Sequence, residues 1–69
     1  MRIEYDRKHD LLNIEFLIGE KIQNSKEIDG MVFDYDRRKR LVAVEILDVS
    51  KRTAKKPIET VEFALAASR

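Results

Sequence analysis

The sequence predicts a mainly β fold, and three observations support this prediction. Residues 4–17 and 34–47 have similar sequences at a constant offset of 30 positions. Apolar and polar residues alternate within both copies, which is typical of half-buried strands. A polar segment divides each copy near its middle, so each copy is predicted to form a β-hairpin.

The two copies are predicted to bury the same face of their strands. Ile3 and Tyr5 share one face at the start of the first copy, and the even offset preserves this parity in the second. Asp6 and Asp36 begin the two polar segments, where an Asp carboxylate can accept backbone N–H groups further along a turn.

The segment between the copies is predicted to add a linking strand. Ser25–Ile28 is compatible with a short strand, and Asp29-Gly30 is a strong signal for a tight turn into Met31–Asp36. Asp48–Thr53 is predicted to form a helical turn. Residues 58–67 have a mixed pattern. Ile58–Phe63 are rich in strand-forming residues, which favours a last strand, with a short helix as the alternative.

These elements predict a single domain over residues 1–69, with a C-terminal extension over 48–69. The expected architecture is an antiparallel meander of two similar hairpins, a linking strand, and a C-terminal strand or short helix. An α+β fold is the alternative. Four leucines have the parity opposite to the main core: Leu11, Leu17, Leu41 and Leu47. A thin sheet with apolar residues on both faces needs a second layer, so a homodimer is expected.

The composition limits the classes of site. A chain of 69 residues without cysteine has no disulfide or thiolate metal site, and a single histidine argues against structural zinc. A helix that spans a bilayer needs about 20 apolar residues, and no apolar run approaches this length. The N-terminus also lacks the apolar core of a signal peptide. We therefore expect a cytoplasmic protein with no cofactor.

The charges divide along the chain. Residues 1–36 carry a net charge of −4, and residues 37–56 carry a net charge of +6. The candidate binding residues for a partner or for nucleic acid are Arg37, Arg38, Lys39, Arg40, Lys51, Arg52, Lys55 and Lys56. Such a group can neutralise phosphates. Neighbouring acids and the lack of interleaved aromatic residues make a solubility surface or a partner surface the favoured interpretation.

Acidic residues recur at turns and strand ends: Asp6, Asp10, Asp34, Asp36 and Asp48. Asp6 and Asp36 would come close if the two hairpins met symmetrically. Glu15 and Glu45 repeat in mid-strand, and the favoured interpretation is cross-strand pairing with Lys or Arg, or a role in keeping one sheet face polar. His9 is expected to be an exposed turn residue. No nucleophile or phosphate-binding glycine loop accompanies these groups, so no catalytic or metal-binding residue is assigned.

Four segments together carry a resemblance to a known family: Ile3–Asp6, Asp10–Ile14, Gly30–Asp36 and Arg40–Lys51. Over about residues 1–52 the chain resembles the domain of unknown function 2283 family of small prokaryotic proteins. Lys39 and Ala43 stand where that family often has glycine. The resemblance implies a small antiparallel β domain with a C-terminal extension, and it implies no established activity.

These observations predict a non-enzymatic interaction module that is homodimeric and binds a small protein partner, as an antitoxin or adaptor does. Addition of a partner strand to an exposed sheet edge is the expected mode. Nucleic-acid binding through the basic residues is the second hypothesis. A metal-dependent enzyme that uses Asp6, Asp36, Glu15 or Glu45 is the third.

Overall fold

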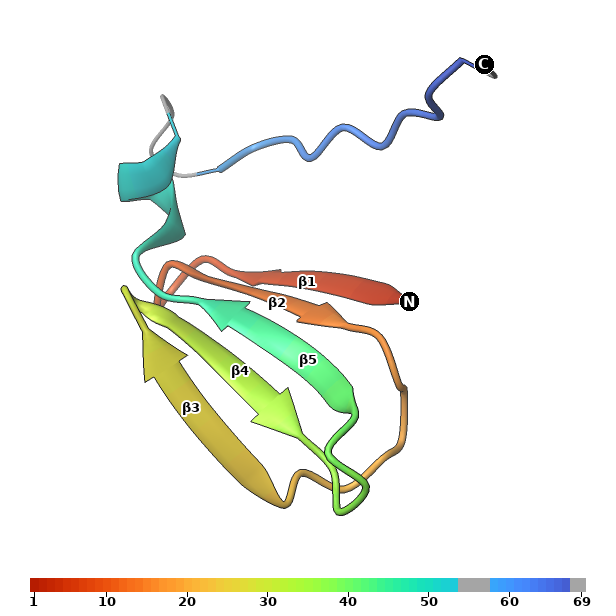
Figure 1. The fold of residues 1–69 in the computed structure, drawn as a ribbon. Helices are drawn as coiled ribbons and strands as arrows, with labels where there is room; N and C mark the ends of the chain where they lie inside the picture. Colours follow the sequence, from red (N-terminus) through yellow and green to blue (C-terminus); the bar gives the residue numbers. More distant parts are fainter. Residues whose placement is uncertain (54–57, 68–69) are drawn as a thin grey trace.

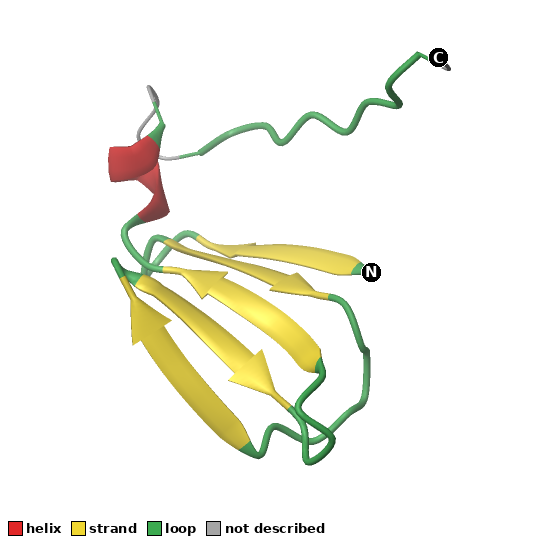
Figure 2. Ribbon diagram, viewed as in Figure 1, coloured by secondary structure: helices red, strands yellow, loops and turns green. Residues whose placement is uncertain are grey.

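The computed structural model describes residues 1–53 and 58–67. Residues 2–46 contain one open antiparallel sheet of five strands (Figures 1 and 2). The elements are β1 (Arg2–Asp6), β2 (Leu11–Glu15), β3 (Asn24–Ile28), β4 (Met31–Tyr35), β5 (Leu41–Ile46) and the 3-10 helix η1 (Val49–Arg52). The predicted mainly β fold is confirmed, as are the linking strand and the helical turn after the second copy.

The strand order is β1-β2-β5-β4-β3, which differs from a simple meander. The linking strand β3 lies at the outer edge beside β4, and β5 lies between β2 and β4. The turn between β3 and β4 contains Asp29 and Gly30, with φ angles of 52° and 73°. Positive φ at both positions is what a two-residue hairpin turn of type I′ requires.

The internal repeat produces a local twofold axis normal to the sheet. Ile14 of β2 pairs with Val44 of β5, which is its own counterpart in the repeat. The axis therefore passes between these two residues, and it relates the hairpin β1–β2 to the hairpin β4–β5. Because a twofold axis reverses the strand direction, the two hairpin turns lie at opposite ends of the sheet.

The two faces of the sheet differ in polarity. We call one the apolar face, which carries Ile3, Tyr5, Leu12, Ile14, Ile28, Met31, Phe33, Val44 and Ile46. We call the other the acidic face, which carries Glu4, Glu15, Glu27, Asp34 and Glu45. The predicted parity of the repeats is thereby confirmed.

The apolar face is only partly covered by the rest of the chain. Ile3 is 44% exposed and Ile28 is 51% exposed, although both have the parity of the core. Among the described residues, the buried apolar side chains are Leu12, Val42, Ala43 and Val49. One layer of strands thus leaves much of its apolar surface in contact with water.

Residues 58–67, which we call the tail, form neither a strand nor a helix, so the expected C-terminal strand or short helix is wrong for this segment. A strand needs a neighbouring strand to bond its backbone, and the tail runs away from the sheet beyond β1 (Figure 1). Its first residue, Ile58, lies beside Tyr5, and its backbone interacts with the Tyr5 hydroxyl. Val61, Phe63 and Leu65 are exposed. The described residues include no helix long and apolar enough to cross a membrane.

Candidate functional site

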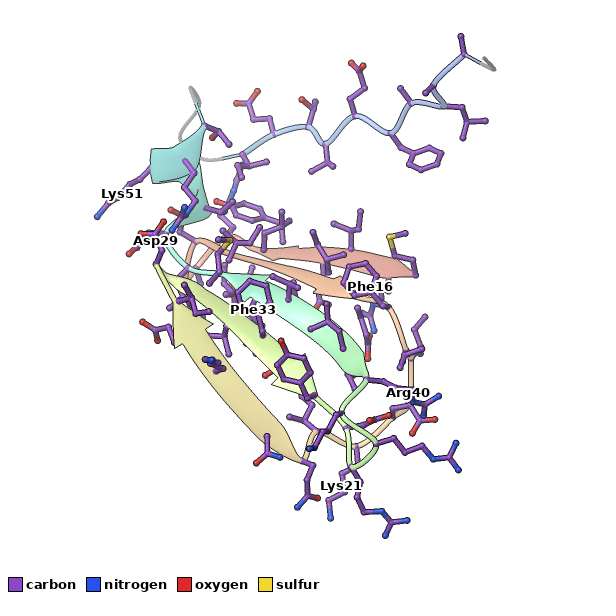
Figure 3. The ribbon with its side chains drawn as sticks, in the orientation of Figure 1. Phe16, Lys21, Asp29, Phe33, Arg40 and Lys51 are labelled. Atoms are coloured by element: carbon purple, nitrogen blue, oxygen red, sulfur yellow. The ribbon has the colours of Figure 1, made fainter. Side chains whose placement is uncertain are left out.

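The predicted basic residues form two separate groups. Arg37, Arg38, Lys39 and Arg40 are exposed in the turn between β4 and β5, whereas Lys51 and Arg52 lie in η1 after the other end of β5. Six residues of strand separate these ends by about 20 Å. Figure 3 shows Arg40 at one end of the sheet and Lys51 at the other. Lys55 and Lys56 lie outside the described residues.

The turn between β4 and β5 borders an open hollow of about 550 Å³. Its lining residues are Glu20, Lys21, Gln23, Asp36, Arg37, Arg38 and Arg40. Sequence reasoning missed Lys21, because only the folded chain brings the segment after β2 beside this turn (Figure 3). In the described part of the chain, no carboxylate lies within ion-pair distance of Lys21, Arg37 or Arg38.

The basic residues of η1 have a different environment. A second hollow, of about 500 Å³, is lined by Glu27, Asp29, Gly30, Leu47, Asp48, Lys51 and Arg52. The Arg52 guanidinium donates to the Asp29 carbonyl oxygen, and its Nη1 lies 3.7 Å from Asp29 Oδ2. Neighbouring acids therefore offset the positive charge at this end of the sheet.

The repeated Asp residues of the two turns act as turn formers. Asp36 Oδ1 accepts the backbone N–H groups of Arg38 at 2.8 Å and Arg40 at 2.9 Å, and Oδ2 accepts Nε of Arg40 at 2.8 Å. Hydrogen bonds from the backbone and side chain of Arg40 lower the pKa of Asp36. Asp6 accepts His9 Nδ1 at 2.7 Å and the His9 backbone N–H at 3.2 Å, and these bonds lower the pKa of Asp6.

The turn carboxylates do not converge, because the local twofold axis places Asp6 and Asp36 at opposite ends of the sheet. The hairpins therefore do not meet in the way that would bring Asp6 and Asp36 together. His9 is exposed in its turn, as predicted. The described residues contain no group of three or more His, Cys, Asp or Glu that could hold a metal ion.

Asp10 joins the first turn to η1. Its Oδ2 accepts the Ser50 hydroxyl at 2.5 Å, and its Oδ1 accepts the Tyr5 hydroxyl at 2.8 Å. Burial, together with the hydrogen bond to Asp10, raises the pKa of Tyr5. No local sequence signal predicts this contact, because Asp10 and Ser50 are 40 positions apart.

Asp34 and Glu45 form a carboxyl pair near the centre of the acidic face. Asp34 of β4 lies opposite Ala43, and Glu45 of β5 lies two residues further along, so the two side chains are diagonal neighbours. Asp34 is 2% exposed, and its Oδ1 accepts the Ser25 hydroxyl at 2.6 Å. Its Oδ2 is buried and has no donor among the described residues.

The environment of Glu45 favours its protonated form. A hydrogen bond with Asp34, followed by burial and the charge of Asp34, raises the pKa of Glu45 to about 7. Protonated Glu45 can supply the donor that Asp34 Oδ2 lacks. Glu45 has no Lys or Arg as a strand partner, since it lies opposite Asn13 and Val32. Glu15 does lie opposite Arg2, and both glutamates keep their face of the sheet polar, as predicted.

The side-chain oxygen of Asn13 is also buried and has no donor among the described residues. Asn13 of β2 lies directly opposite Glu45 of β5. The acidic face therefore has unmatched acceptors on two neighbouring strands. Sequence parity alone places Asp34 and Glu45 on one face, but the burial of Asp34 depends on β3 and its Ser25.

Comparison with known proteins identifies a family for this chain. No curated protein and no solved structure matches the chain. The family model described as "Protein of unknown function (DUF2283)" matches residues 2–50, which include the whole sheet and the start of η1. The tail lies outside this match. The chain thus belongs to the DUF2283 family.

Proposed function

We propose that this protein is a small non-enzymatic interaction module that forms a homodimer and binds a small protein partner. The observation that carries the proposal is the apolar face, which the chain leaves partly uncovered. Phe16, which follows β2, is 42% exposed, and Ile3 and Ile28 at the two sheet edges are similarly open. Contiguous exposed apolar surface of this kind marks interaction sites in soluble proteins.

A second copy is the occupant that suits this face best. Lys26 is the one charged side chain at the strand positions of the apolar face within the described residues. A face with so little charge complements another copy of itself. The small number of buried apolar side chains in one copy also supports a dimer, because small domains with little core gain stability from association.

The tail supplies the remaining contact area. Five strands of about five residues cover about 24 by 17 Å in projection, or about 400 Å². A standard interface buries about 800 Å² on each partner. The first residue of the tail, Ile58, lies beside Tyr5 of the apolar face. Further along, the tail exposes Val61, Phe63 and Leu65 at alternate positions. Packing of this segment against the second copy would bring the interface towards the standard size.

Sedimentation equilibrium over a wide range of protein concentrations tests the dimer. We expect wild type to sediment as a dimer and Ile28→Glu to shift towards monomer, because the new charge would be buried without a partner. Gln23→Glu adds the same charge outside the apolar face and should remain dimeric. Wild type that stays monomeric at every concentration would contradict the proposal.

A matched pair of substitutions tests the tail. Phe63→Ser removes a large exposed apolar side chain, and we expect a weaker dimer. Glu62→Ser changes the adjacent residue, whose side chain alternates with Phe63 along an extended backbone, and should leave the dimer constant unchanged. Equal effects of the two substitutions on the dimer constant would contradict a role for the tail in the interface.

The small protein partner is assigned to surfaces that the dimer leaves free. Every residue of the edge strand β3 is exposed, which supports addition of a partner strand there in the manner of an antitoxin or adaptor. The acidic face is the second free surface. Neither surface carries a constellation of catalytic groups.

Nucleic-acid binding is the second candidate, and the hollow beside the β4–β5 turn favours it. Lys21, Arg37 and Arg38 surround this hollow without ion pairs in the described part of the chain. Arg38→Glu should then weaken binding of a single-stranded oligonucleotide and reduce the slope of affinity against salt concentration. Lys51→Glu at the opposite end is the control, and an equal loss in both variants would contradict a site in the hollow.

A further inference from the structure

We propose that the acidic face binds a positively charged segment of a protein partner, and that an Arg or Lys side chain of this segment contacts the Asp34–Glu45 pair. The inference rests on the proposed function, because it names the chemistry of the small protein partner and the surface that receives it. It does not depend on the dimer, since the apolar face lies on the other side of the sheet.

Charge complementarity is the first reason. At the strand positions of the acidic face, the carboxylates of Glu4, Glu15, Glu27, Asp34 and Glu45 are accompanied by one basic side chain, that of Arg2. The whole protein has a net charge of +1, so this surface departs strongly from the average. Such a surface steers and orients a basic partner.

The internal repeat supplies the second reason, because the chain contains the same carboxyl pair twice. Glu4 and Glu15 are the counterparts of Asp34 and Glu45. In the first copy Arg2 accompanies the pair, and its Nη2 lies 2.9 Å from Glu4 Oε2. In the second copy the position of Arg2 is occupied by Val32. The second pair therefore lacks the guanidinium that the chain provides for the first.

The unmatched acceptors are the third reason. Asp34 Oδ2 and Asn13 Oδ1 are buried without a donor among the described residues. A buried acceptor without a donor is costly, and a carboxylate more so than a neutral group. Glu45 is less buried than Asp34 and lies on β5, between Asp34 and Asn13. Its carboxyl group is therefore the one that an incoming side chain reaches.

Below about pH 7, a proton on Glu45 can give Asp34 Oδ2 its donor, whereas ionised Glu45 leaves this oxygen unmatched. The charged groups that face Glu45 are Asp34 on β4, Glu15 on its neighbour β2 and Glu27 on β3, and all are acidic. When a guanidinium or ammonium approaches, Glu45 releases this proton to water and pairs with the cation. Binding is therefore linked to the loss of a proton and strengthens as the pH rises through neutrality.

An organic cation fits the site better than a metal ion. Hard metal ions require several oxygens at one point, whereas this site offers two carboxylates, one of them buried. Among the described residues, no three Asp, Glu, His or Cys side chains come together closely enough to hold a metal ion. A long Arg or Lys side chain carries its own donors and needs only one open carboxylate to begin the contact.

Fluorescence anisotropy with a labelled hexa-arginine peptide at low ionic strength tests the proposal at pH 6 and at pH 8. We expect wild type to bind about fivefold more tightly at pH 8, which is the upper range for a partly exposed ion pair. Glu45→Gln should lose this pH effect and bind at both pH values as wild type does at pH 6.

Glu15→Gln is the matched control, because it removes the same charge from the same face at the repeat-equivalent position. It should weaken binding at both pH values and keep the difference between them. Equal behaviour of the two variants would overturn the proposal and leave only diffuse charge attraction. Stabilisation of wild type but not Glu45→Gln by Mg²⁺ or Ca²⁺ alone, with no pH-linked peptide binding, would overturn it in favour of a metal site.

The same samples distinguish this inference from the dimer. Sedimentation of each variant shows its oligomeric state, and circular dichroism shows whether it is folded. If wild type is a monomer that binds the peptide as described, the proposed dimer is contradicted and the proposed site on the acidic face is supported. If wild type is a dimer without pH-linked peptide binding, the dimer is supported and the site is contradicted.

Discussion

The two copies of the internal repeat have the same carboxyl pair in different surroundings. In the first copy, Glu4 lies on the edge strand β1, where its carboxylate is exposed and bonded to Arg2. In the second copy, Asp34 lies on β4, which has β5 on one side and β3 on the other. The neighbouring strand β3 contributes Ser25 and helps to reduce the exposure of Asp34 to 2%.

This difference shows how one added strand changes the chemistry of a repeated motif. The pKa of Glu45 is raised to about 7 by its bond to the buried Asp34 and by its own burial. The first copy has no flanking strand outside β1, so water and Arg2 accompany its carboxylates. A sequence repeat therefore conserves position and parity, while solvent access decides the protonation state.

The largest expected effect tests whether the two copies contribute alike to the core. Leu12 and Val42 are equivalent positions, and both are buried on central strands. We expect Leu12→Ala to lower the free energy of unfolding by about 2–5 kcal/mol, as for other buried leucines. Val42→Ala removes fewer atoms and should lower it by about 2 kcal/mol. Urea denaturation measures both.

The exposed position Ile3→Ala is the control for this comparison. Ile3 lies on an edge strand with 44% of its surface in water, so its loss should cost less than that of either central residue. A smaller effect at Leu12 than at Ile3 would show that the sheet is not organised around its two central strands.

The second prediction concerns the pH dependence of stability. The pKa of Glu45 is raised from 4.5 to about 7 in the folded protein, so its protonated form is favoured by folding. This contribution is fully present below pH 4.5 and is lost as the pH rises to about 7. The full shift would correspond to about 3 kcal/mol, and solvent at the partly exposed side chain reduces this to about 1–2 kcal/mol.

Thermal unfolding between pH 4.5 and pH 8 measures this effect. Glu45→Gln should remove most of the decline in stability over that range, since the amide does not ionise. Glu15→Gln should keep the decline seen in wild type. If the two variants follow the same curve, the carboxyl pairs of the two copies are equivalent and the comparison fails.

Much of the fold could be predicted because period-two patterns and turn residues are local signals. The parity of the strands, the turn at Asp29-Gly30 and the linking strand follow from neighbouring residues alone. The position of β3 at the sheet edge and of β5 between β2 and β4 depends on long-range pairing, which the local pattern does not encode. The tail was misassigned because its alternating residues resemble a strand while no neighbouring strand receives them.

The candidate sites were less predictable for a related reason. Asp34 was assigned to a turn or strand end, but its burial depends on Ser25, nine positions away on β3. Lys21 joins the basic turn only because the segment after β2 passes beside it. Charge and spacing identify such residues as candidates, but the third strand and the connecting segment decide which of them meet.

The third prediction gives the second copy the cation that the first copy has. Val32→Arg places a guanidinium opposite Glu45, at the repeat position of Arg2. An adjacent positive charge favours the ionised carboxylate, so the pKa of Glu45 should fall by about one unit or more. NMR titration of the Glu45 carboxyl carbon measures it. An unchanged pKa would mean that the missing cation is not a reason for the raised pKa of Glu45. Burial and the bond to Asp34 would then explain it.

The smallest expected effect comes from the reverse change in the first copy. Arg2→Ala removes the one basic side chain among the strand positions of the acidic face within the described residues. Because Arg2 and Glu4 are both largely exposed, water replaces the guanidinium, and the free energy of unfolding should change by about 0–1 kcal/mol. Urea denaturation at low and at moderate salt checks this, since added salt should shrink the difference further. A loss as large as that in Leu12→Ala would show that Glu4 and Glu15 are as poorly solvated as Asp34 and Glu45. The contrast between the copies would then lie in their cations and not in the strand β3.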